Sequence, residues 1–113
     1  MTNKELKYLE DVVLAINEID SFIGEIKQFK DFNNNVLLRR ATEREFEIIG
    51  EALRNFKKIN VTTEVTNSAE IIGLRNRIVH AYDSVDYERL WSIIINHLPK
   101  LKIELETLIK KFE

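Results

Sequence analysis

The apolar residues in the first quarter of the chain recur alternately at steps of three and four. This spacing places them on one face of an α-helix. Thr2 followed by Glu5 fits a capping box at the start of that helix. The Asn-rich segment 31–35 favours a turn, so we expect a first helix over about residues 3–31, long enough to need a partner helix. The apolar face consists of Leu9, Val12, Ile16, Ile19, Ile23 and Ile26.

Two further helices are predicted in the middle of the chain. Residues 36–57 combine an apolar face with a face of opposite charges one turn apart, which predicts a second helix. Residues 60–66 are polar and β-branched without strand-like alternation, so we expect a loop there. Asn67, with Glu70 three residues later, resembles an N-cap for a third helix over residues 68–82.

The last part of the chain continues the helical pattern. Asp86 can cap a fourth helix that starts near Tyr87. Pro99 cannot donate a backbone hydrogen bond, so the helix should kink or restart there before the apolar pattern runs on to Phe112. We therefore predict an all-α antiparallel bundle of four to five helices, forming one domain over residues 1–113.

Composition narrows the class of protein. Of the 113 residues, 44% are hydrophobic and 32% are charged, while only 3 are glycine and 1 is proline. This excludes collagen-like and turn-rich all-β proteins. Cysteine is absent, which rules out disulfides, a thiolate zinc site and a cysteine nucleophile. No apolar segment approaches the roughly 20 residues needed to span a bilayer, and the charged N-terminus does not resemble a signal peptide. We expect a cytoplasmic protein.

The charge balance limits how nucleic acid could bind. The chain has 17 basic and 19 acidic residues, which gives a net charge of −2. A strongly basic nucleic-acid-binding surface is therefore not indicated. Any contact with RNA must depend on a few well-placed cations.

The richest chemistry lies in residues 75–82, Arg-Asn-Arg-Ile-Val-His-Ala-Tyr. Arginine presents a rigid fork of donors that suits phosphate oxygens. Histidine, with an unperturbed pKa of about 6.5, suits proton transfer near neutral pH. Together, Arg75 and His80 could support metal-independent RNA cleavage, in which the ribose 2′-hydroxyl attacks and the arginine stabilises the anionic phosphorus centre.

Helical geometry restricts how these residues can cooperate. Arg75 and His80 are separated by roughly 140° around the helix axis and by about 7.5 Å along it. Asn76 and His80, four residues apart, share a face. One helix thus supplies half a site unless the arginine side chain curls round. Two copies of this helix meeting around a twofold axis would complete the site, so we predict a homodimer.

The Arg-x4-His spacing alone is weakly specific, and simpler interpretations stay open. Arg75 and Arg77 could be solvated residues paired with Glu70 or Asp83. His80 could be a helix-terminal histidine that interacts with the helix dipole.

Several neighbours also allow two interpretations. Gly73 could permit close approach of a second helix or mark a local kink, and Asn76 could simply bond across a helix pair. Glu51 could hold Arg75 or Arg77, or pair within its own helix. His97 is interpreted as structural, because it has no arginine five residues earlier. The Asp, Glu and His residues show no metal-ligand spacing, so no metal or cofactor is expected.

Four segments in register resemble the HEPN superfamily, in particular its HepT-like branch of small helical toxins paired with minimal nucleotidyltransferases. Residues 41–52 look like that branch's second helix, which ends in Gly-Glu-Ala. Residues 73–82 look like its signature helix, Arg-Asn-x3-His followed by x-Tyr. Residues 85–91 and the pair 98–99 also match. The loop 61–68 differs, since it lacks the Pro and Trp often found there.

The resemblance implies a homodimeric ribonuclease with a composite site at the dimer interface. Arg75 would contact the scissile phosphate, and His80 would transfer protons. Asn76 would orient the phosphate or the imidazole. Tyr82 matches the tyrosine that the partner nucleotidyltransferase modifies with AMP, and a bulky anion there would repel RNA. Arg77, Gly73 and Glu51 would support the site or RNA binding.

Two other function classes remain open from the sequence. The protein could be a non-catalytic subunit that presents a nucleotide or small substrate to a separate nucleotidyltransferase. It could also be a purely structural dimeric bundle, in which Asn76, Arg77 and His80 would lie scattered in solvent.

Overall fold

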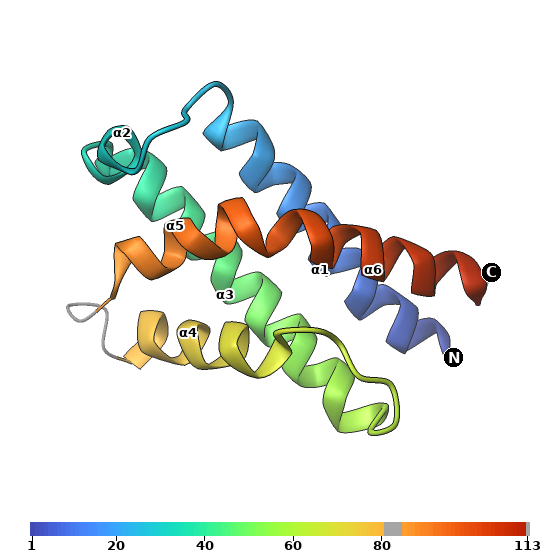
Figure 1. Ribbon diagram of the computed structural model, residues 1–113. Helices are drawn as coiled ribbons and strands as arrows, with labels where there is room; N and C mark the ends of the chain where they lie inside the picture. The colour runs from blue at the N-terminus through green and yellow to red at the C-terminus, as the bar shows by residue number, and fades with distance from the viewer. Residues whose placement is uncertain (81–84, 113) are drawn as a thin grey trace.

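The computed structural model describes residues 1–80 and 85–112. Within these ranges the chain forms helices and no strands, as Figure 1 shows. This confirms the predicted all-α class, with one short helix more than expected. The helices are α1 (Asn3–Ile23), α2 (Phe29–Asn33), α3 (Val36–Ile59), α4 (Ser68–His80), α5 (Tyr87–Asn96) and α6 (Leu98–Lys111).

The two longest helices, α1 and α3, pack against each other in opposite directions (Figure 1). Helix α6 lies along α1, and α5 continues almost in line with α6. Helix α4 crosses α3 at the edge of the bundle, and α3 is its principal neighbour. The helix that carries the predicted site is therefore supported mainly from one side.

The core lies where α1, α3, α5 and α6 meet. Phe46 and Phe56 of α3 are completely buried, as is Phe32 of α2. The ring of Phe32 lies 5.1 Å, centroid to centroid, from that of Trp91 in α5. Burial of these large apolar side chains supplies the main driving force for the fold.

Local capping fixes several helix starts. Thr2 and Glu5 form the predicted capping box, with the Glu5 amide donating to Thr2 Oγ1 at 3.1 Å. Asp86 Oδ1 accepts from the Arg89 amide at 3.0 Å, which confirms the predicted cap of α5. Each cap satisfies a backbone donor that has no partner inside its helix.

The first helix is shorter than predicted. It ends at Ile23, because Gly24 adopts a φ of 55° and its amide donates to the Asp20 carbonyl at 3.0 Å. This region of φ favours glycine and ends a helix. The expected helix over residues 3–31 was wrong beyond this point, although Ile26 still packs against the core.

The predicted restart at Pro99 is confirmed. His97 ends α5 and precedes α6, and Pro99 lies in the first turn of α6, where a missing amide costs nothing. The side-chain amide of Asn67, immediately before α4, lies 3.1 Å from His97 Nδ1. This contact ties the start of α4 to the α5–α6 junction and supports a structural role for His97. Within the described ranges, no helix is both long and apolar enough to cross a membrane.

Candidate functional site

Helix α4 has one buried face, and the predicted site residues lie outside it. Ile71, Leu74 and Ile78 are at most 6% exposed and face the core, as their spacing predicts. Asn76 and His80 lie on the exposed side of the helix. The apolar residues anchor α4 and leave its polar face accessible.

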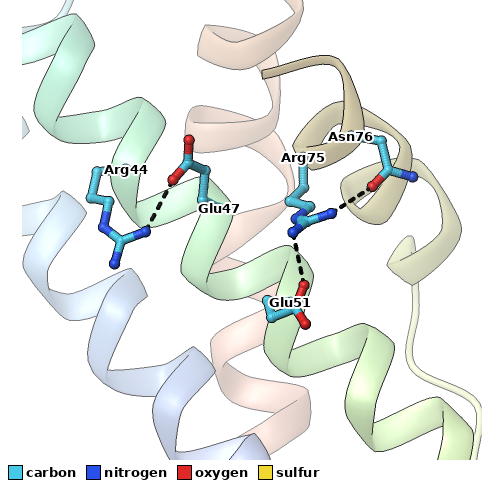
Figure 2. Close-up of polar contacts among 5 residues, drawn as sticks. All are labelled: Arg44, Glu47, Glu51, Arg75 and Asn76. Atoms are coloured by element: carbon cyan, nitrogen blue, oxygen red, sulfur yellow. Dashed lines mark hydrogen bonds and ion pairs between the residues drawn. The ribbon is translucent and has the colours of Figure 1, made fainter. Parts of the chain in front are cut away.

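Arg75 lies between these two faces and is directed toward α3 (Figure 2). Its side chain is only 17% exposed. Nη2 lies 2.9 Å from Glu51 Oε2 on α3, and Nη1 donates to Asn76 Oδ1 at 3.0 Å. The guanidinium is thus held by a carboxylate from another helix and by the next side chain of its own helix.

The pairing of Arg75 selects among the interpretations left open by the sequence. Glu51 contacts Arg75, rather than a residue of its own helix. Glu70 pairs instead with Arg89 on α5, at 3.1 Å. Arg75 is therefore not an ordinary solvated arginine of the α4 surface.

A cleft of about 290 Å³ opens beside Arg75. Arg44 and Glu47 of α3 line it and form their own ion pair at 3.0 Å (Figure 2). Arg44 was not predicted from the sequence as a site residue. Its side chain is 71% exposed, and its charge is paired with Glu47.

The other predicted residues lie farther round α4. His80 is exposed and is the last residue of the helix. Arg77 and Gly73 line a second cleft, of about 370 Å³, between α4 and α5. A Cβ atom on Gly73 would have no heavy atom within 4 Å, so packing within the described chain does not require glycine there. Tyr82 lies outside the described residues.

The structure thus brings Arg75, Asn76 and Glu51 into contact, whereas His80 lies on the exposed side of α4. The arginine does reach across to Asn76, the residue that shares a face with His80. In the described part of the chain, His, Asp and Glu residues form no group of three able to hold a metal ion. The arrangement holds the Arg75 guanidinium between a carboxylate and an amide and leaves the His80 imidazole exposed five residues later on the same helix.

Comparison with known proteins identifies the family. The family described as Ribonuclease HepT-like matches residues 13–108, most of the chain. The chain belongs to this HepT-like family. This confirms the resemblance inferred from the sequence, and the matched range includes Glu51, Arg75, Asn76, His80 and Tyr82.

Three curated relatives align over nearly their whole length. A protein of Thermococcus cleftensis, named a probable ribonuclease HepT, is 35% identical to this chain. The alignment covers 97% of this chain and 100% of that protein. A protein of Methanocaldococcus jannaschii, named as a proposed RNase, is 35% identical over 94% of this chain and 98% of its own. A similarly named protein of Caldanaerobacter subterraneus is 32% identical over 92% and 93%. The search of solved structures gave no significant match.

Proposed function

We propose that this HepT-like protein is an endoribonuclease that cleaves RNA by attack of the ribose 2′-hydroxyl, without a metal. The observation that carries the proposal is the held guanidinium of Arg75, bound by Glu51 at 2.9 Å and by Asn76 at 3.0 Å, in a chain of the HepT-like family. The products would be a cyclic 2′,3′-phosphate and a 5′-hydroxyl.

The chemistry assigns a separate role to each side chain. A guanidinium has five N–H donors, and the contacts to Glu51 and Asn76 use one terminal nitrogen each. The remaining N–H groups on these nitrogens can bind phosphate oxygens as negative charge builds up in the transition state. His80, exposed at the end of α4, would accept or deliver the proton.

A homodimer would complete the site. Ala69, Gly73, Asn76 and His80 are all exposed and follow one another at steps of four, three and four along α4. Such spacing forms a narrow seam suited to pairing with a second helix, and the small residues allow close approach. Pairing two α4 helices along this seam would place the Asn76 and His80 side chains of both copies around one groove.

The biological role we propose is that of the toxin in a toxin–antitoxin module. The partner would be a nucleotidyltransferase that attaches AMP to Tyr82, two residues after His80. The added phosphate would repel the RNA backbone and block the groove. Co-expression with the partner, followed by mass spectrometry of the HepT-like protein, tests this: Tyr82→Phe should abolish the added mass of AMP.

Cleavage is tested by incubating the purified protein with mixed RNAs in the presence of a chelator. His80→Ala and Arg75→Ala should each abolish cleavage while light scattering still reports a dimer. His97→Ala is the matched histidine control and should keep activity at temperatures where it stays folded. Full activity of His80→Ala would refute its assignment. RNA binding without cleavage by the wild type would favour the non-catalytic subunit.

A further inference from the structure

Gly50 occupies an unusual place for a glycine. It lies in the middle of α3 and is buried, although glycine is less favourable than alanine inside a helix. Its backbone is not in the left-handed region that would require glycine. A packing reason must therefore explain why a side chain is absent.

The packing partner of Gly50 is Arg75. A Cβ atom built on Gly50 would overlap with Arg75 Cβ and would lie 2.7 Å from Arg75 Cγ and 3.5 Å from Cδ. Carbon atoms normally approach to about 3.5–4.0 Å. The first carbons of the arginine side chain therefore lie directly on the α3 backbone at Gly50.

The next residue of α3 holds the other end of the same side chain. Glu51 follows Gly50 and binds the guanidinium at 2.9 Å. Gly50 packs against the first carbons of the Arg75 side chain and Glu51 binds its guanidinium, so two adjacent residues of α3 position both ends of this side chain. Arg75 is 17% exposed as a result, which limits the alternative rotamers available to it.

We propose that Gly50 is a positioning residue for Arg75, and that its missing side chain creates the seat from which the guanidinium reaches both Glu51 and Asn76. This inference rests on the proposed ribonuclease function. Gly50 itself touches no substrate and acts only through the arginine.

A methyl group at residue 50 would have to displace α4 or the arginine stem by on the order of 1 Å to restore normal carbon contacts. A displacement of that size at a reacting group can cost about 100-fold in rate. We expect Gly50→Ala to lower kcat by about 10- to 100-fold and to change KM little, because most RNA contacts would remain.

The activity test compares Gly50→Ala with Ile19→Val, measured where circular dichroism shows both variants folded. Ile19 is fully buried in α1, and its substitution weakens the core without entering the site. Ile19→Val should keep the wild-type kcat. Equal kcat values for Gly50→Ala and wild type would overturn the proposal, as would an equal loss of kcat in both variants.

A second measurement does not depend on cleavage. The NMR resonances of the Arg75 guanidinium, assigned by their loss in Arg75→Lys, should shift or broaden in Gly50→Ala and stay unchanged in Ile19→Val. The melting temperature should fall on Gly50→Ala in the wild type but not in an Arg75→Gly background, where the stem is gone. The proposed role of Gly50 would be refuted if the Arg75 resonances were unchanged in Gly50→Ala, or if the melting temperature fell equally in the wild-type and Arg75→Gly backgrounds. Absence of RNA cleavage by the wild type would instead count against the proposed function alone.

Discussion

Replacing Glu51 with glutamine tests whether its charge positions Arg75 or takes part in the reaction. The substitution preserves the size of the side chain and an oxygen that can accept a hydrogen bond, but it removes the negative charge. The Glu51 side chain is 45% exposed, and its Oε2 lies 2.9 Å from Arg75 Nη2. The contacting Oε2 atom is itself buried and the Arg75 side chain is only 17% exposed, so the pair is partly buried and the strength of a surface ion pair is a lower bound for it.

A surface ion pair sets the lower bound of the expected effect. Surface ion pairs contribute about 0.2–1 kcal/mol. If all of this energy serves to orient the guanidinium in the transition state, its loss lowers the rate by at least about 1.4- to 5-fold. The effect should diminish as salt is added, because salt screens exposed charges.

The assay is single-turnover cleavage of one RNA at low and high salt, with Glu47→Gln as the matched control. Glu47 lies one turn earlier on α3 and pairs with Arg44 at 3.0 Å, not with Arg75 (Figure 2). Its variant should leave the rate within twofold of wild type at either salt concentration. A loss of more than 100-fold for Glu51→Gln would refute a purely positioning role and indicate proton transfer by the carboxylate.

Three other perturbations have defined outcomes. Arg75→Lys should reduce single-turnover cleavage by about 10²–10³-fold, because an ammonium is a point charge that lacks the planar fork. Burial and then the charge of Glu18 raise the pKa of Glu45. Folding therefore favours the protonated form of this side chain. Its contribution to stability is present at low pH and is lost as pH rises through the folded-state pKa. Glu45→Gln should consequently be more stable than wild type at pH 7 and flatten the dependence of melting temperature on pH above 4.5. Asp86→Ala should lower the urea-derived free energy of unfolding by about 0.5–2 kcal/mol, because it removes the 3.0 Å cap on the Arg89 amide.

Three features set by nearby residues were predicted from the sequence, whereas the N-cap expected at Asn67 was wrong, because Asn67 has a φ of 62° and its side-chain amide contacts His97 instead. The caps at Thr2 and Asp86 and the restart at Pro99 each depend on residues within one turn. The end of the first helix was not predictable from spacing, because the apolar pattern continues past Gly24 to Ile26. Gly24 is itself a residue type that often ends helices, and its φ of 55° shows that the helix stops there.

For the site, too, the sequence predicts local geometry but not the contacts between residues that are far apart in the chain. Spacing correctly separates the direction of Arg75 from that of His80 around the helix. It cannot give the path of the arginine side chain or choose Glu51 as its partner, because 24 residues separate them and their contact depends on how α3 and α4 cross. Gly50 carried a usable signal, a glycine inside a strongly helical segment, but its meaning emerges only from the residue packed on it.

The peripheral position of α4 affects how the protein should behave in hydrogen–deuterium exchange. Since α3 is its principal neighbour and its other side is open (Figure 1), α4 should open locally at lower free-energy cost than α1 or α3. Its amides should therefore exchange earlier than those of the central helices. Any molecule that covers the outer side of α4, whether a second copy, RNA or a protein inhibitor, should slow that exchange, so the deuterium uptake of one short helix can report on occupancy.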